Sequence, residues 1–418
     1  MKQRFLLLMM TALLSVGAWA ENVWTGSQTM KSYESPLKLE TSSLSLTAGD
    51  LLTFTISNVT DTGYGLRVCA HNADNDNWYG NVVKSVSATA AGVVKMVIDN
   101  DIITAAATEL WINGNFTLTS IDVEKAASVN VLNEEYTPNY NYKQLNSANL
   151  LYAKAGDVLS VTISAVGDNV NWRKLYLHTT AEQPSNADAS TILYTCENGN
   201  LKVGTIDITL TADMITNIQN GSFYIGGYEF TLTAVDLYLT SPTVTISSAG
   251  YATFGYPVAL DLTGIEAYTA AVSGDKVVLS SVKGKKIPAG TGIILEGSGN
   301  VTIPLTTEAT DDITGNDLKV SDGTVKGDGT IFVLGQNEGK VGFGKLKSGD
   351  VLAAGKAYLT ITGSESRSFI EIGDGTTSIS EVKKVVTDDY QYYNLNGQRV
   401  AQPTKGVYIV NGKKIIIK

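Results

Sequence analysis

Histidine and cysteine are nearly absent from this chain, which has two of each among 418 residues. Zinc sites in proteins are built mainly from these two residue types, so a His-based zinc site is excluded by number. The sequence also lacks a His-Glu-x-x-His, a Gly-x-Ser-x-Gly and a Walker motif. We interpret His71 and His178 as sheet residues with satisfied hydrogen bonds, and we expect no active site.

Charged residues are also scarce at 17%, and no stretch of about 18 apolar residues marks a membrane-spanning helix. Hydrophobic content is an ordinary 43% and glycine is abundant at 40 residues. This profile is typical of β structure with many turns and excludes coiled coil and disorder. The formal net charge of −10 disfavours nucleic acid as a partner, because an acidic body does not attract phosphates.

Residues 1–20 have the pattern of a signal peptide. Lys2 and Arg4 precede the apolar run Phe5–Leu14, and Ala18-Trp19-Ala20 is a small-x-small cleavage site. No cysteine follows the cut, which argues against a bacterial lipid anchor. We therefore predict an exported protein. Export permits a disulfide, so Cys69 and Cys196 are interpreted either as buried thiols or as a bridge between modules.

The chain repeats itself once. Ala48-Gly49-Asp50 and the strand after it return 107 residues later as Ala155-Gly156-Asp157, and Phe116–Val123 returns 114 residues later as Phe230–Leu237. A period close to the length of a small domain indicates two copies of one module. We place the copies at residues 21–126 and 127–241.

Apolar residues in these modules alternate with polar ones, as in Leu52–Ser57, which predicts strands with one buried face. Turn signals every 8–12 residues favour two sheets packed face to face. Short helices are expected at Asp101–Ala107 and Ala212–Gln219, the second between an N-cap at Thr211 and a stop at Gly221. The predicted fold is all-β, with tandem jelly-roll-like sandwiches.

The rest of the chain predicts more β structure. Residues 242–374 have dense Gly turns between short strands and form a third β-rich domain, and residues 375–388 form a linker. The tail, residues 389–418, has Asn-Gly turns at 396–397 and 411–412, which predict a β-meander.

Three resemblances follow from particular motifs. Tyr393-Asn-Leu-Asn-Gly-Gln-Arg-Val, Lys405-Gly-Val-Tyr-Ile-Val and Lys413-Lys-Ile-Ile-Ile-Lys resemble the C-terminal sorting domain of type IX secretion substrates. That resemblance implies transport by the export machinery of a Gram-negative bacterium, to the outer-membrane surface or the medium. The third domain, with Ala249-Gly-Tyr-Ala-Thr-Phe, resembles an uncharacterised β domain of secreted proteins in the same bacteria. Trp24-Thr-Gly-Ser and Gly114-Asn-Phe-Thr-Leu-Thr resemble jelly-roll domains of the carbohydrate-binding type.

Aromatic residues beside Asn and Asp are the best binding candidates. Sugar rings stack their C–H faces on aromatic rings while polar side chains bind the hydroxyls. The candidates are Asp76, Asn77, Trp78 and Tyr79 in module one and Asn171, Trp172 and Arg173 in module two. The alternative is that these rings cover the ends of the sandwich cores, and Tyr136, Tyr140 and Tyr142 are a third aromatic surface.

The same loop of module one has a second interpretation. Asp74 and Asp76 are oxygen ligands of the type that calcium prefers, but Trp78 and Tyr79 break the EF-hand spacing, so we expect neither metal nor cofactor. The sequence therefore predicts a non-catalytic exported or cell-surface binding protein with a glycan as partner. A structural or adhesive protein with spacer modules is the first alternative, and a polysaccharide hydrolase with an unrecognised site is the second.

Overall fold

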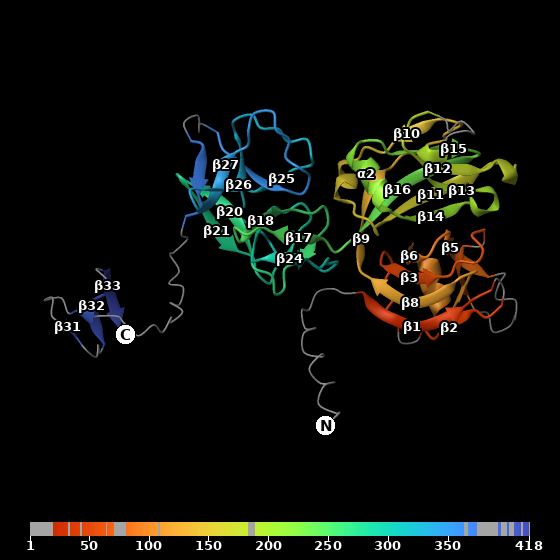
Figure 1. Ribbon diagram of the computed structural model, residues 1–418, viewed down its shortest axis with the longest axis horizontal. Helices are drawn as coiled ribbons and strands as arrows, with labels where there is room; N and C mark the ends of the chain where they lie inside the picture. The colour runs from red at the N-terminus through yellow and green to blue at the C-terminus, as the bar shows by residue number, and fades with distance from the viewer. Residues whose placement is uncertain are drawn as a thin grey trace, which may run out of the picture. The chain divides into compact units, whose positions relative to one another are not determined.

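Figure 1 shows the computed structural model of the chain. The structure describes residues 20–373 except 32–33, 42–43, 64, 71–80, 108, 183–188 and 363–366, and tail residues 392–393, 399–400, 405–410 and 413–417. The chain divides into two compact units, Met1–Gly373 and Asp374–Lys418. Strands dominate the described residues, whose two α-helices are short, so the predicted all-β fold is confirmed.

The first module is a sandwich of two antiparallel sheets. Its elements are β1 (Glu21–Thr29), β2 (Leu37–Leu39), β3 (Leu51–Ser57), β4 (Leu66–Ala70), β5 (Val82–Val86), β6 (Gly92–Val97), α1 (Asn100–Ala106), β7 (Leu110–Asn113) and β8 (Thr117–Glu124). One sheet has the order β1-β8-β3-β6 and the other β2-β7-β4-β5. Eight strands paired in this order form a jelly roll.

The second module repeats this arrangement. Its strands are β9 (Ala126–Leu132), β10 (Tyr142–Gln144), β11 (Val158–Val166), β12 (Lys174–His178), β13 (Ile192–Glu197), β14 (Gly204–Thr209), β15 (Tyr224–Tyr228) and β16 (Phe230–Thr240), with α2 (Ala212–Gln219) before β15. The sheets have the orders β9-β16-β11-β14 and β10-β15-β12-β13, which match module one strand for strand. The expected duplication of a sandwich is therefore confirmed.

Irregularities of the sheets repeat as well. The ladder between β3 and β8 has a β-bulge that recurs between β11 and β16, and the ladder between β4 and β5 has one that recurs between β12 and β13. They lie at Thr55/Ile56 and Thr162/Ile163, and at Val68/Cys69 and Leu177/His178. Bulges change the direction and twist of a strand, so their recurrence shows that the two modules share backbone detail.

The repeated Ala-Gly-Asp motif is a structural turn that starts a strand. Gly49 and Gly156 have φ angles of 93° and 91°, a region that side chains other than hydrogen disfavour. Asp50 and Asp157 follow with relative exposures of 2% and 0%. Both positions precede the central strand of a sheet, so the clearest repeat in the sequence marks folding and not binding.

The two predicted helices are confirmed; α2 has the expected bounds and N-cap, and α1 begins and ends one residue before the expected Asp101–Ala107. Asp99 caps α1 by accepting a hydrogen bond from the amide of Ile102 at 2.9 Å. Thr211 caps α2 by accepting one from the amide of Met214 at 3.2 Å, and Gly221 follows the helix with a φ of 68°. These are the residue types that satisfy the free backbone groups at helix ends.

The two modules contact each other through the edge strands β6 and β14. The amide of Lys95 donates to Thr209 Oγ1 at 3.0 Å, and the amide of Val97 donates to Asp207 Oδ2 at 2.7 Å. Side chains of β14 thus satisfy backbone groups on the open edge of β6. A small apolar cluster lies beside these bonds: Leu51, Val97, Ala126, Val158 and Tyr238.

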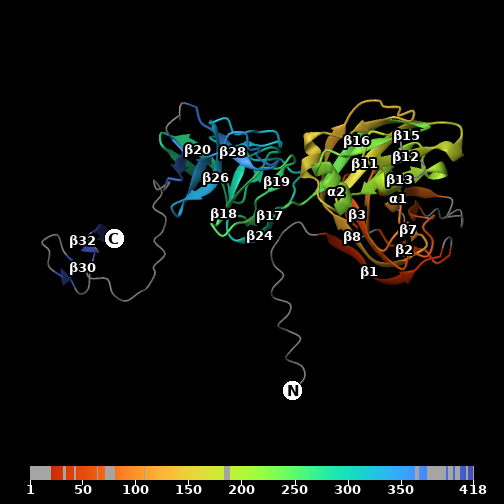
Figure 2. The ribbon, with the colours of Figure 1, turned by 45° about the horizontal axis from the view of Figure 1, so that its top comes forward.

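The third domain follows with shorter strands (Figure 2). They are β17 (Thr243–Ile246), β18 (Tyr251–Phe254), β19 (Leu260–Asp261), β20 (Ala267–Ser273), β21 (Lys276–Ser281), β22 (Lys286–Ile287), β23 (Ile293–Glu296), β24 (Gly299–Thr302), β25 (Lys319–Val320), β26 (Ile331–Asn337), β27 (Lys340–Lys345), β28 (Ala357–Thr360) and β29 (Phe369–Glu371). A core around Phe332 and Phe343 lies between the sheets β18-β23-β20-β21 and β25-β28-β26-β27-β29.

Module two is packed against this third domain. Tyr152, at the end of the 3₁₀-helix η2 (Ala148–Tyr152), donates to the carbonyl of Ser321 at 3.3 Å. Its ring meets Tyr256 edge to face at a centroid distance of 5.8 Å. The hydroxyl of Tyr256 donates back to the carbonyl of Thr240 at 3.2 Å. Aromatic and backbone contacts therefore join module two to its neighbour.

The tail is a four-stranded antiparallel sheet in its described residues, but it is not the predicted meander, because β30 pairs with both β31 and β32 and so separates β31 from β32. The strands are β30 (Tyr392–Tyr393), β31 (Arg399–Val400), β32 (Gly406–Val410) and β33 (Lys413–Ile417), in the order β31-β30-β32-β33. Val410 pairs with Lys413, so β32 and β33 form a tight hairpin. The predicted turn residues 396–397 and 411–412 lie outside the described residues.

Candidate functional site

Trp172 is the most exposed large aromatic side chain of the described residues, with a relative exposure of 55%. It ends the 3₁₀-helix η3 (Val170–Trp172) between β11 and β12. The turn is closed by its backbone, since the amide of Trp172 donates to the carbonyl of Asn169 at 3.0 Å. The ring therefore lies on the surface, and the alternative that it covers the core is wrong for this residue.

The polar neighbours of Trp172 are exposed too. Asp168, Asn169 and Asn171 have exposed side chains, while Arg173 is half-buried and donates from Nε to the carbonyl of Gly167 at 2.8 Å. Arg173 thus braces the base of the turn, and the carboxylate and amides remain accessible. An exposed indole beside such groups has the composition that sugar rings and their hydroxyls require.

A second short helix, η5 (Asn198–Asn200), supports the Trp172 turn. The amide of Asn198 donates to the carbonyl of Arg173 at 2.8 Å. Next to it, Lys174 Nζ lies 3.2 Å from a carboxylate oxygen of Glu197. Its hydrogen bond to Glu197 raises the pKa of Lys174 to about 12, so this lysine stays charged at neutral pH.

The predicted residues of module one cannot be compared directly with this turn. Asp74, Asp76, Asn77, Trp78 and Tyr79 lie outside the described residues, as does His71. Among the described residues, no group of three or more His, Cys, Asp or Glu side chains is arranged to hold a metal ion.

The outer face of the sheet β10-β15-β12-β13 presents tyrosines that the sequence interpretation largely missed. Tyr140 stacks on Tyr228 at a centroid distance of 4.8 Å, and Tyr142 lies 5.1 Å from the ring of His178. Tyr142 and Tyr176 both pair with Gly226, where a Cβ would come within 2.7 Å of the Tyr142 ring. The missing side chain of Gly226 makes room for Tyr142 on this face.

The signal for this face was present in β12, where Lys174, Tyr176 and His178 alternate with buried leucines. Tyr140 was expected as an aromatic surface, and it is 42% exposed. His178 is 1% exposed; its Nε2 lies 2.7 Å from Thr191 Oγ1 and its Nδ1 2.8 Å from the carbonyl of Thr180. It is therefore a satisfied sheet residue, as predicted.

The other tryptophans serve the packing. Trp111 is 7% exposed on β7, under Lys38, whose Nζ lies 4.3 Å from the ring centroid. Trp24 on β1 is half-buried against the core of module one. Trp111 belongs to a small cluster with Cys69 and half-buried Val82, apart from the main core of the module.

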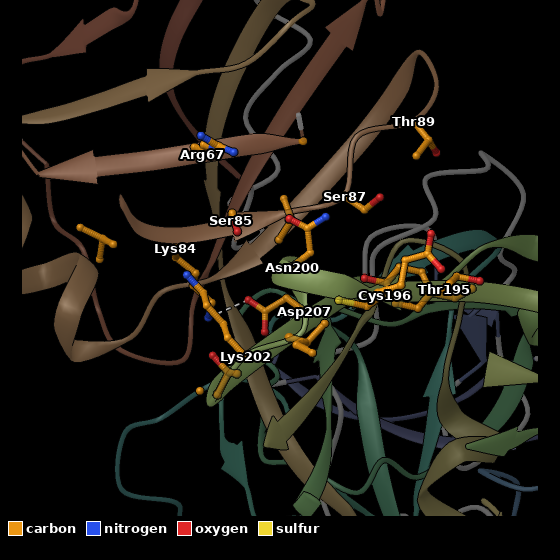
Figure 3. Close-up of a pocket in the computed structure, with 18 of the residues that line it drawn as sticks. Arg67, Lys84, Ser85, Ser87, Thr89, Thr195, Cys196, Asn200, Lys202 and Asp207 are labelled. Atoms are coloured by element: carbon orange, nitrogen blue, oxygen red, sulfur yellow. Dashed lines mark ion pairs between the residues drawn. The ribbon is translucent and has the colours of Figure 1, made fainter. Parts of the chain in front are cut away.

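A cleft of 540 Å³ opens between the two modules (Figure 3). Module one contributes β5 with the loops before β4 and after β5, and module two contributes β13, η5 and β14. Hydroxyl and amide groups are frequent among the lining side chains: Thr62, Ser85, Ser87, Thr89, Thr195, Asn200 and Thr205. Sites for small ligands commonly lie at domain interfaces and have volumes in this range, about 300–1,000 Å³.

A buried ion pair joins the two modules in the wall of this cleft, drawn as a dashed line in Figure 3. Lys84 Nζ of β5 lies 2.7 Å from Asp207 Oδ2 of β14 and 3.2 Å from Asp99, and it donates to the carbonyl of Val97 at 3.0 Å. Ser160 donates to the other oxygen of Asp207 at 2.7 Å. Every polar atom of the pair is satisfied, which a buried pair requires.

Both cysteines are free and buried, so the bridge considered above does not form in this structure. Burial raises the pKa of Cys69 to about 11 and of Cys196 to about 12. Thiols held in the neutral form are poor nucleophiles and poor metal ligands. The interpretation of the two cysteines as small buried residues is therefore confirmed.

The chain matches no protein-family model, no curated protein sequence and no solved structure. No helix among the described residues is both long enough and apolar enough to cross a bilayer.

Proposed function

We propose that this protein is an exported, non-catalytic glycan-binding protein, and that the Trp172 turn of module two is a binding site. The single observation that carries the proposal is the 55% exposure of Trp172 on a turn braced by Arg173. A fixed, solvent-exposed indole offers a stacking surface without the entropic cost of ordering a mobile loop. Exposed Asn171 and Asp168 supply hydrogen bonds to hydroxyls.

The fold supports this proposal without requiring it, because jelly rolls serve many functions. The tyrosines of the adjacent sheet face extend the aromatic surface of the same module. Export and a place on the cell surface follow from the N-terminal segment and the resemblance of the tail, and both belong to the proposal. Secretion of a chain lacking residues 389–418, followed by cell fractionation, tests the role of the tail.

Glycan-array binding of the mature protein tests the binding site. We expect the Trp172→Ala variant to lose at least about tenfold in affinity, or about 1.4 kcal/mol, because the stacking surface is removed. Trp172→Tyr should keep part of the signal. Val351→Ala is the control, since Val351 is 53% exposed and belongs to the third domain, not to the module that carries the turn.

Two outcomes would contradict the proposal. A wild-type protein that binds no glycan favours the spacer alternative. New reducing ends in a polysaccharide panel, released by wild type, favour the hydrolase alternative.

A further inference from the structure

We propose that the cleft between the two modules is an extended subsite for a neutral oligosaccharide chain whose end stacks on the Trp172 turn. The inference rests on the proposed glycan binding and adds the length and charge of the ligand. It also assigns a role to module one, whose own predicted loop at 71–80 lies outside the described residues.

The first support is continuity between the turn and the cleft. Asn200 lines the cleft and ends η5, the short helix that holds the Trp172 turn. The ideal Cβ position of Gly199 lies 3.9 Å from Val170 Cγ1, so η5 and η3 are packed together. Glu197, which lines the cleft, pairs with Lys174 two residues after Trp172. The η5 helix therefore contacts the Trp172 turn through η3 and contributes Asn200 to the cleft, which links the two parts of the proposed site.

The second support is the chemistry of the cleft walls. Ser85 and Ser87 of module one are exposed, and Asn200 and Thr205 are exposed on module two. Short hydroxyl and amide side chains donate and accept at once, as the hydroxyls of a sugar do. Val203, 59% exposed, adds an apolar patch for the C–H face of a ring.

The third support is the balance of charge, which excludes a polyanion. The charged side chains that line the cleft are three basic and four acidic ones: Arg67, Lys84, Lys202, Asp99, Asp101, Glu197 and Asp207. Lys84 is held by Asp207 and Asp99, and Glu197 by Lys174. A cleft with mixed and largely paired charges on an acidic protein gives no net attraction for uronates or sulfates.

The fourth support is rigidity. Lys84 and Asp207 come from opposite modules and are 6% and 0% exposed in their side chains. Together with the hydrogen bonds that amides of β6 donate to side chains of β14, this pair fixes the position of one cleft wall relative to the other. A preformed cleft loses little entropy when a ligand binds.

The experiment compares ligand lengths on wild type and on a variant with a filled cleft. Calorimetry with disaccharides and hexasaccharides of neutral cello-, xylo-, manno- and malto-series supplies the probes, and a hexameric oligogalacturonate is the charged arm. In Ser85→Trp the indole occupies the cleft from an exposed position of β5. Ser128→Trp is the matched control, because Ser128 is exposed on β9 and does not line the cleft.

We expect a neutral hexasaccharide to bind wild type at least about tenfold more tightly than its disaccharide, and Ser85→Trp to abolish that difference while leaving disaccharide binding unchanged. Ser128→Trp should behave as wild type. Equal binding of both lengths to wild type, or an intact length effect in Ser85→Trp, overturns the cleft subsite and leaves the Trp172 site standing. Preference for the galacturonate overturns the assigned charge, and no binding at either length overturns both proposals.

Discussion

The two modules have the same architecture but different surfaces. Their strand orders agree, one β-bulge recurs in each sheet, and the positive-φ glycines Gly49 and Gly92 correspond to Gly156 and Gly204. Core residues agree in kind as well, since Leu52 and Leu159 occupy the same place on the central strands and are 1% and 0% exposed. The two modules therefore share the strands and core residues that bury apolar surface, and this burial stabilises both copies in the same way.

Polar positions at the same register differ between the copies. Lys95 on β6 corresponds to Asp207 on β14, and Lys84 on β5 corresponds to Tyr194 on β13. These differences allow a contact that two identical modules would not make, because module two supplies the acceptors and module one the backbone donors and the lysine. The differences on the edge strands of the two modules therefore allow the modules to pack together, with the cleft between them.

Asp207→Ala should cause the largest loss of stability. It removes the nearer carboxylate partner of Lys84, which keeps only Asp99 and the carbonyl of Val97, and breaking a buried pair typically costs about 3–5 kcal/mol of unfolding free energy. Urea denaturation measures the change. The double variant Lys84→Met with Asp207→Leu should recover most of it, since apolar replacements of buried pairs are often neutral.

A surface pair supplies the control for Asp207→Ala. Lys340 and Glu371 form an ion pair with side chains 64% and 50% exposed. Lys340→Ala should change the unfolding free energy by less than about 1 kcal/mol. If Asp207→Ala is as mild as Lys340→Ala, the inter-module pair does not hold the modules together.

The next effect tests the likeness of the two cores. Leu52→Ala and Leu159→Ala each remove a buried side chain from the same position of the repeat, and each should cost about 2–5 kcal/mol. We expect similar values in calorimetric or urea unfolding, because the surrounding strands are equivalent. A large loss in one copy and none in the other would show that the cores are packed differently despite their common topology.

Features that depend on neighbouring residues could be predicted from the sequence, as the ends of α2 show. Thr211 and Gly221 mark the ends of α2 because caps act within a few residues. The short strands expected between Gly turns in the third domain are present, as in β21 (Lys276–Ser281), because turns flank such strands directly. The duplication was visible because Gly49 and Gly156 serve a backbone conformation that few other residues adopt.

Contacts between distant residues escaped prediction for the opposite reason. Lys84 and Asp207 are 123 residues apart, and neither is unusual in its own strand. Tyr140 and Tyr228 meet only because β10 and β15 are paired. The exposure of Trp172 likewise depends on how η3 packs against η5, although its neighbours had marked it as a candidate. The cleft itself exists only once the two modules are joined.

The smallest effect at neutral pH is expected for Cys196→Val, which copies Val86, the residue of module one at the same register. Burial raises the pKa of Cys196 from 9.0 to about 12. Between these values the unfolded chain releases the thiol proton while the native protein keeps it. The thiol therefore makes its full contribution to the unfolding free energy below pH 9, and that contribution is lost as the pH rises towards 12.

Cys196→Val should have the same unfolding free energy as wild type at pH 7. Above pH 9 the variant should lose less of it than wild type, by about 1 kcal/mol per pH unit. Urea midpoints at pH 7 and pH 10 measure this difference, and identical pH slopes would show that the thiol is solvated in module two.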